Sequence, residues 1–350
     1  MIGAHLDIRT VNAIRSMLAL CTVILTAGAL YLGRSIFAPV AFSIFAMAIV
    51  WPLQDALQRK VPKLLALLFT LVLTMIALGL LALAIAWGSS QVGQWLLRNL
   101  DRFQFIYTKT SDWLEGHGIF VTALLADRFD VSWLVRIAQQ AAARLNSMAG
   151  FALLVFAFAI LGLLEVGQVN LRMKTLESRH PQLNLSQAAE RIAGQFRKYM
   201  LIRGVASVLT GFVTFCFAAL VGLDLAVAWG LITFVLNYIP FLGPLLAVVL
   251  ATLFAAAQFE SLQMSLIVLA GLSVIQFAIG SYLEPLLSGA TLAISPFLVL
   301  FAVFFWSFLW GIPGAFIGVP LTIAILTICE QYAATRWLPV LLSDSAARKY

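Results

Sequence analysis

The chain has 350 residues, of which 62% are hydrophobic and 11% charged, and its mean hydropathy is +1.00. A soluble domain has about 45–50% apolar and about 25% charged residues, so this composition excludes an ordinary soluble protein and indicates that the solvent is lipid. The formal charge of +7 does not indicate nucleic-acid binding, because the basic residues lie in short segments beside apolar runs, a pattern that orients membrane proteins.

The first apolar runs predict a helical hairpin at the N-terminus. They cover about residues 14–32 and 37–53 and are joined by a short connection. Three basic residues follow within 59–63, and the bias of basic residues toward the cytoplasm places this loop and the N-terminus on that side. A third span is expected at about residues 64–87.

The 60 residues from 88 to 147 predict an amphipathic helical segment outside the cytoplasm. They contain six basic and five acidic residues, and apolar residues recur at helical spacing between Val92 and Tyr107. A long, nearly neutral segment can be translocated despite its arginines, so it is expected on the bilayer surface or on a neighbouring subunit. A packed soluble helical hairpin is the alternative that the periodicity leaves open.

A fourth span at about residues 148–164 is expected to return the chain to the cytoplasm. The following residues 169–200 contain six basic and two acidic residues, a net charge of +4. Either Asn184 or Ser186 is predicted to cap the helix that continues into a fifth span at about 201–221.

Residues 204–335 contain no lysine or arginine over 132 positions. Two pairs of short helices broken by proline and glycine are expected there, with first members at about residues 226–239 and 296–310 and a full-length helix at 262–282 between the pairs. At about 1.5 Å per residue, these first members reach only about 21–22 Å, less than a hydrocarbon core of about 30 Å. Such helices are typical of secondary transporters with a site near the midplane. Whether the pairs are re-entrant or cross the membrane stays open.

The helix-breaking residues of this half are predicted to act as hinges or close-approach positions rather than as ligands. They are Pro240, Gly243, Pro244, Pro285, Gly289, Pro296, Gly311, Pro313, Gly314 and Pro320.

Glu284 is the main candidate for an ion-coupling or substrate-binding side chain. Ser273, Gln276, Gly280 and Glu284 are spaced by three, four and four residues, which places them on one helix face. A carboxylate within a span faces the bundle interior or a water path, where it binds a cation, takes a proton or pairs with a substrate. Because residues 204–335 lack lysine and arginine, no local ion-pair partner is expected, which favours a coupling Na⁺ or H⁺. The alternative is a hydrated glutamate at the cytoplasmic end of the helix.

Asn237 is the second candidate. It lies three residues before Pro240, where backbone carbonyls lose their helical partners, so its amide either repairs the backbone or contacts a polar substrate.

Enzymatic functions are disfavoured by the residue types in the C-terminal half. All three histidines precede residue 204, and neither a His-Glu-x-x-His helix nor a Gly-x-x-x-x-Gly-Lys-[Ser/Thr] loop occurs. The sequence therefore predicts no catalytic residue, no cofactor and no metal site, and transport energy is expected from an ion gradient or from the gradient of the substrate.

Several elements of this half resemble the autoinducer-2 exporter family of permeases. Residues 239–247 read Ile-Pro-Phe-Leu-Gly-Pro-Leu-Leu-Ala, which is similar to the Pro-x-x-Gly-Pro element of that family. The family's Glu-Pro and Gly-rich elements are matched by Glu284, Pro285, Gly289, Ser295, Pro296, Phe297, Gly311, Gly314, Gly318, Val319, Pro320 and Leu321.

The resemblance implies a homo-oligomeric inner-membrane permease of about eight spans. Family members are linked to export of autoinducer-2 or to sodium or proton antiport, but a substrate does not transfer with a fold. Ser288 stands where the family often has a basic or bulkier residue, which removes a candidate partner of Glu284.

The sequence thus predicts an all-α polytopic membrane protein with two broken helical hairpins in its C-terminal half. The expected parts are an N-terminal hairpin with a third span (residues 1–87), the amphipathic segment (88–147), the fourth span with the basic segment (148–200), a transport core (201–335) and a cytoplasmic tail (336–350).

The predicted function is a secondary transporter in the bacterial plasma membrane, with both termini cytoplasmic. It is expected to export a small polar metabolite or signal, coupled to a proton or sodium gradient, with Glu284, Gln276, Ser273 and Asn237 at the site. The alternative is a non-transporting scaffold that recruits partners through the amphipathic and basic segments.

Overall fold

The computed structural model describes residues 8–99, 101–102, 115–116, 132–180, 184–288, 295–332 and 335–342. Every regular element in these ranges is helical. The elements are α1 (Ile8–Leu32), α2 (Arg34–Gln58), α3 (Lys63–Arg98), α6 (Ser132–Arg179), α7 (Leu185–Val221), α8 (Ala226–Leu236), α9 (Leu242–Phe259), α10 (Leu262–Ala278), the π-helix η1 (Ile279–Leu283), α11 (Glu284–Ser288), α12 (Pro296–Trp310), α13 (Ile312–Gln331) and α14 (Trp337–Leu342).

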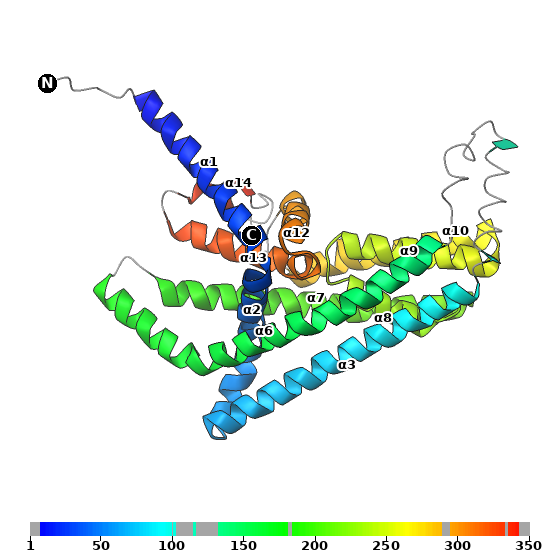
Figure 1. Ribbon diagram of the computed structural model, residues 1–350, viewed down its shortest axis with the longest axis horizontal. Helices are drawn as coiled ribbons and strands as arrows, with labels where there is room; N and C mark the ends of the chain where they lie inside the picture. Colours follow the sequence, from blue (N-terminus) through cyan, green and yellow to red (C-terminus); the bar gives the residue numbers. More distant parts are fainter. Residues whose placement is uncertain are drawn as a thin grey trace.

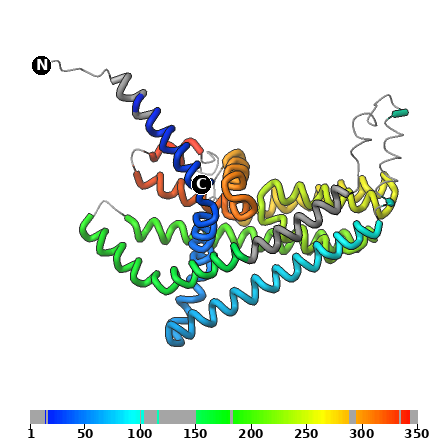
Figure 2. The backbone as a smooth tube through the Cα atoms, viewed as in Figure 1, coloured from blue at the N-terminus to red at the C-terminus, as the bar shows by residue number. Residues whose placement is uncertain are grey.

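Within these described ranges, seven helices are long and apolar enough to cross a membrane, and three shorter apolar helices accompany them. This confirms the predicted class, an all-α polytopic membrane protein. Figures 1 and 2 show α3, α6 and α7 running along the length of the molecule. At one end α3 and α7 pack against α8, whereas α2 crosses α6 and α7 nearer to the middle of the molecule, where α13 also packs on α7 (Figure 1).

The first two helices do not form the expected side-by-side hairpin. Only Gly33 separates α1 from α2, and the chain bends there so that α2 leads away from α1 (Figure 1). α1 instead contacts α12, because Trp310 Nε1 donates a hydrogen bond to the Leu30 carbonyl at 3.1 Å. The rings of Tyr31 and Phe308 also stack there, with centroids 5.6 Å apart.

Three of the predicted segment boundaries fall inside continuous helices. α3 continues beyond the expected end at residue 87, α6 runs through residue 148, and α7 runs through residue 201. Helices of 36, 48 and 37 residues are about 54, 72 and 56 Å long, so each one extends well beyond a hydrocarbon core of about 30 Å. Most of the predicted amphipathic segment lies outside the described residues.

The connection between α6 and α7 is closed by Glu177 rather than by the predicted caps. The Ser186 backbone N–H donates to Glu177 Oε1 at 2.6 Å, and the Ser186 hydroxyl donates to Oε2 at 2.9 Å. Asn184 occupies the N-cap position without a side-chain capping bond. A carboxylate from the preceding helix therefore accepts a hydrogen bond from one of the free N–H groups at the start of α7.

Two apolar clusters form the core of the part of the chain that the structure describes. One packs α12 and α13 against α2 and α7 around Phe45, Phe196 and Trp306. The other joins α7 to α10 around Trp229 and Phe254. Small residues allow α7 and α8 to pack closely, as is common between membrane helices: a Cβ at position 211, now Gly, would lie 2.8 Å from the carbonyl oxygen of Gly230.

Candidate functional site

The first predicted helix break is present between α8 and α9. α8 ends at Leu236 and α9 begins at Leu242, and Pro240 lies in the connection. Phe241 has φ +61°, a backbone conformation that is strained for a residue with a side chain. A Cβ at Gly243 would overlap the Leu236 carbonyl, so only glycine allows the start of α9 to pack on the end of α8. Pro244 follows in the first turn of α9.

α8 is too short to cross a membrane by itself. It has 11 residues and is about 16 Å long, roughly half of a hydrocarbon core of about 30 Å. Backbone groups at a break inside a hydrocarbon core require partners from the protein or from a water-filled cavity.

The two outer ends of this hairpin are tied together by Gln258. Its Nε2 donates to the Gly222 carbonyl at 2.8 Å, and its Oε1 accepts from the Asp224 backbone N–H at 2.7 Å. Arg102 joins the same end by donating to the Gln258 carbonyl at 3.1 Å and lying 3.8 Å from Glu260. The start of α8 and the end of α9 therefore lie at the same end of the molecule.

The second break, between α12 and α13, repeats the same packing. Gly311 alone separates the helices and has φ +68°, which favours glycine. A Cβ at Gly314 would overlap the Trp306 carbonyl, so the first turn of α13 also packs on the last turn of the helix before it. Pro313 lies in that first turn, and Pro320 lies inside α13.

The remaining predicted break residues lie at or near helix starts. Pro285 is the second residue of α11. Pro296 is the first residue of α12, and the Ser295 hydroxyl caps that helix by accepting from the Leu298 N–H at 3.3 Å. Gly289 lies outside the described residues.

Glu284 forms an ion pair with Arg203, which corrects the expectation that it has no basic partner. Arg203 Nη1 lies 2.8 Å from Glu284 Oε1, and the exposed fractions of the two side chains are only 12% and 18%. Arg203 is the last basic residue before the cation-free stretch and lies within α7, which packs against η1 and α11. The expectation was wrong because it rested on the lack of basic residues within 204–335, whereas the partner lies one position before that stretch.

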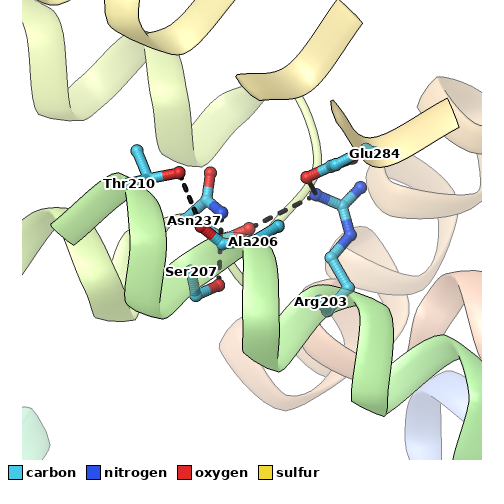
Figure 3. A network of polar contacts seen from close by, with 6 residues as sticks. All are labelled: Arg203, Ala206, Ser207, Thr210, Asn237 and Glu284. Carbon is cyan, nitrogen blue, oxygen red and sulfur yellow. Dashed lines mark hydrogen bonds and ion pairs between the residues drawn. The ribbon is translucent and has the colours of Figure 1, made fainter. Parts of the chain in front are cut away.

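Arg203 also supplies a partner for the α8–α9 break. Figure 3 shows its guanidinium between Glu284 and the backbone carbonyl of Asn237, to which Nη1 donates at 3.4 Å. The Asn237 side chain is buried, with 3% of the residue exposed, and its Nδ2 donates to the Ser207 hydroxyl at 3.2 Å. In this structure the Asn237 amide therefore bonds α7, while Arg203 is the group that contacts the backbone of the break.

The residues of the predicted polar stripe that ends at Glu284 differ in how exposed they are. Ser273 and Gly280 are exposed, and Gln276 is half-buried. The π-helix at residues 279–283 widens the turn just before Glu284 and changes the face on which the carboxylate emerges. Pro285 explains why the π-helix lies at residues 279–283, because a proline inside a helix lacks an N–H and clashes with the carbonyl four residues earlier.

A polar face on α7 was missed from the sequence. Tyr199, Arg203, Ser207 and Thr210 follow one another at intervals of four, four and three residues, and all are buried or nearly so. The Thr210 hydroxyl donates to the Ala206 carbonyl at 2.7 Å (Figure 3), and the Arg203 guanidinium carbon lies 5.8 Å from the centre of the Tyr199 ring. The helical spacing of these four polar residues, within a largely apolar helix, is the feature of the sequence that could have predicted this face.

A metal site has no support in the described part of the chain, where no group of three or more His, Cys, Asp or Glu side chains comes together. The polar centre is therefore an arginine–glutamate pair, an asparagine and hydroxyl groups beside a broken helix.

The membrane-spanning helices and the two broken hairpins, with an ion pair beside one of them, define a polytopic permease. The chain matches the AI-2E family transporter profile over residues 20–334 and belongs to that family. This confirms the resemblance that the Pro-x-x-Gly-Pro and Glu-Pro elements indicated. The protein is thus a multi-pass membrane transporter of a bacterial family, which fits the plasma membrane.

Three relatives match along most of their length. The AI-2 transport protein TqsA of Escherichia coli is 26% identical over 337 residues, covering 96% of this chain and 97% of the relative. A provisionally named transport protein of Borreliella burgdorferi is 30% identical over 328 residues, covering 92% and 89%. One from Haemophilus influenzae is 24% identical over 352 residues, covering 95% and 97%.

Proposed function

We propose that this permease is a secondary transporter that exports a small polar metabolite or signal, with a proton or sodium ion coupled at Glu284. The observation that carries the proposal is the Arg203–Glu284 ion pair, which lies between α7 and α11 and contacts the α8–α9 break. Ionisable residues inside membrane segments are expensive to bury and mark substrate or ion pathways.

The coupling acts through competition for the Glu284 carboxylate. A cation that binds Glu284 removes the partner of Arg203, and the freed guanidinium then no longer holds both α11 and the Asn237 carbonyl. Because one side chain joins these elements, the occupancy of Glu284 biases how α7 packs against the first broken hairpin. The C-terminal half then moves against the N-terminal helices.

A re-entrant arrangement of the first hairpin is supported by its dimensions. α8 is about 16 Å long, too short to cross a hydrocarbon core of about 30 Å. A short entering helix beside full-length spans is the pattern of discontinuous transporter helices, whose ends surround the substrate. Assembly as a homo-oligomer and a cytoplasmic location of both termini remain part of the proposal.

The type of substrate rests on a relative, and the direction rests on the resemblance to the exporter family. TqsA is named as an AI-2 transport protein, and transport of a small signal is proposed for this chain on that similarity. Asn237, Ser207 and Thr210 supply hydrogen-bonding groups beside the ion pair that fit a small polar solute.

The test is a flux measurement in proteoliposomes loaded with a mixture of small metabolites, under imposed proton and sodium gradients. Glu284→Gln is expected to abolish the dependence of efflux on both gradients. Glu260→Gln is the matched control, because that carboxylate also lies in the cation-free half but is 43% exposed at the far end of the hairpin.

A correctly inserted Glu284→Gln protein that transports at the wild-type rate with unchanged pH and sodium dependence would refute the proposal. A wild-type protein that moves none of the metabolites under either gradient would favour the scaffold alternative. Deletion of residues 100–136 then distinguishes the two functions, because a scaffold loses its partners while a transporter that still assembles retains flux.

A further inference from the structure

We infer that the substrate is a small anion, bearing a carboxylate or phosphate group, which replaces Glu284 on Arg203 while a proton neutralises Glu284. The inference rests on the proposed transport function and adds to it the charge of the substrate and the identity of the ion. Because the anion and the proton are bound together, they move in the same direction, and the outward gradient of the anion drives export. It follows from the requirement that neither charge of the Arg203–Glu284 pair be left alone inside the protein.

Arg203 stays charged under all physiological conditions, because a guanidinium is not deprotonated in proteins. In this structure its Nη1 has two acceptors, Glu284 Oε1 at 2.8 Å and the Asn237 carbonyl at 3.4 Å. Its side chain is 12% exposed, so water provides little compensation. Removing Glu284 therefore leaves a charge whose remaining partners are the Asn237 carbonyl, at the end of one long bond, and Tyr199, whose ring centre lies 5.8 Å from the guanidinium carbon.

Separation of α7 from α11 breaks this pair, and leaving one partner of a buried pair uncompensated is strongly destabilising. The site has a net charge of zero in the paired state, from one guanidinium and one carboxylate. An incoming anion on Arg203 and a proton on Glu284 together keep that charge at zero. A neutral solute with a proton leaves Arg203 unpaired, and an anion without a proton leaves Glu284 unpaired.

The surroundings of Arg203 suit an oxyanion. A guanidinium presents a planar set of N–H donors that matches carboxylate and phosphate oxygens. The Asn237 amide, the Ser207 hydroxyl and the Tyr199 ring lie beside it on α7 and the break. The Tyr199 hydroxyl is buried beside the Arg203 guanidinium, which can only donate to it, so the O–H of Tyr199 remains a donor for a further oxygen.

A proton suits Glu284 better than sodium does. Sodium sites in transporters use several oxygens, including unwound backbone carbonyls, whereas a proton needs only one carboxylate oxygen. The break carbonyl of Asn237 already accepts from Arg203. Among the described residues, the titratable side chains facing Glu284 from α7 are Arg203 and Tyr199, and Tyr282 on the adjoining π-helix is exposed.

The experiment measures anion binding and proton uptake on the purified full-length protein in nanodiscs, in weak buffer near neutral pH. The probes are radiolabelled lactate, succinate and inorganic phosphate, with glycerol and ribose as neutral controls. A pH-indicator dye reports proton uptake. At least one of the anions is expected to bind with uptake of about one proton per anion, as linkage requires when bound and free states differ by one proton.

Two variants are expected to change in opposite directions, which misfolding does not produce. Glu284→Gln leaves Arg203 free, so it binds the anion more tightly than the wild type, by about tenfold, without proton uptake. Arg203→Gln loses anion binding. Arg102→Gln is the matched control, since its 3.8 Å pair with Glu260 is about 40% exposed on both sides, and it is expected to behave as the wild type.

The inference is overturned if none of the three anions binds to either the wild type or the Glu284→Gln protein. It is also overturned if binding requires sodium and takes up no proton. After either result, the proposed function still stands if the efflux of a neutral metabolite depends on an ion gradient in the wild type and Glu284→Gln abolishes that dependence. If that substitution changes no flux at all, the proposed function itself is the one that fails.

Discussion

Arg203 and Glu284 are 81 positions apart in the sequence, yet Nη1 of the first lies 2.8 Å from Oε1 of the second. The same guanidinium donates to the Asn237 carbonyl at 3.4 Å, so one side chain links α7, α11 and the break between α8 and α9. A relative movement of these elements requires this contact to be broken or exchanged.

Replacing one partner of the pair is expected to destabilise the protein more than replacing both. Glu284→Met should lower the free energy of unfolding by about 3–5 kcal/mol, because Arg203 remains buried and unpaired. The double variant Arg203→Met with Glu284→Met should lie within about 1 kcal/mol of the wild type and have no transport. Reversible unfolding in mixed micelles gives the stabilities. A double variant as unstable as the single one contradicts a pair in the protein interior.

Alanine at the two close-approach glycines is expected to disturb the hairpins. A Cβ at Gly243 or Gly314 would overlap a backbone carbonyl, so either substitution should cost about 1–3 kcal/mol by overpacking. Gly79→Ala is the control, because nothing lies within 4 Å of its Cβ position and alanine favours a helix by about 1 kcal/mol. Thermal unfolding midpoints in detergent report the difference. Equal midpoints for all three variants would show that the hairpins do not pack this closely.

Pro285→Ala is expected to restore a regular helix at the π-helix and to turn Glu284 away from Arg203. With the cause of the wide turn removed, residues 279–283 can take ordinary helical hydrogen bonds. A double-mutant cycle on the pair should give about 1–3 kcal/mol of coupling in the wild type and less than about 0.5 kcal/mol with Pro285→Ala. An unchanged coupling energy would mean that the proline does not direct the carboxylate.

The tip of the α8–α9 hairpin is expected to be inaccessible from the side of the membrane opposite the start of α8 and the end of α9. A single cysteine at Phe241, in a chain whose three native cysteines are replaced, should resist a membrane-impermeant thiol reagent applied there. Single cysteines at Asp224 and Glu260 should both be labelled from one side, because Gln258 holds the two ends together. Strong labelling at Phe241 from the opposite side would show that α8 and α9 cross the membrane.

Several features of the fold were predictable because they depend on local composition. Long apolar runs identify the spans, since lipid requires about 20 apolar residues per helix. Pro240 and Gly311 mark the two helix breaks, because proline removes an N–H and a positive φ favours glycine. The path of α1 and α2 was not predictable in the same way, because a single connecting glycine permits either a hairpin or a bend.

The candidate site was predictable only in part. Glu284 stands out because an ionisable residue in an apolar helix is rare. Arg203 does not stand out in the sequence, because it lies beside the basic residues of the preceding segment, whose pattern is that of charges that orient a membrane protein. Its role depends on which face of α7 turns inward and on which helix packs there, and neither is encoded within a short window of sequence.

The sequence by itself determined that this protein lies in a lipid bilayer and that it is all-helical. It also determined the positions of the broken helices and the family to which the chain belongs. Each of these follows from hydrophobicity and backbone chemistry along the chain. Only the tertiary structure decided that Glu284 faces Arg203 rather than an unpaired interior, because that contact depends on the packing of α7 against a helix widened before Pro285. Arg203, a cation one residue outside the cation-free stretch, is thus the partner of the Glu284 carboxylate within it.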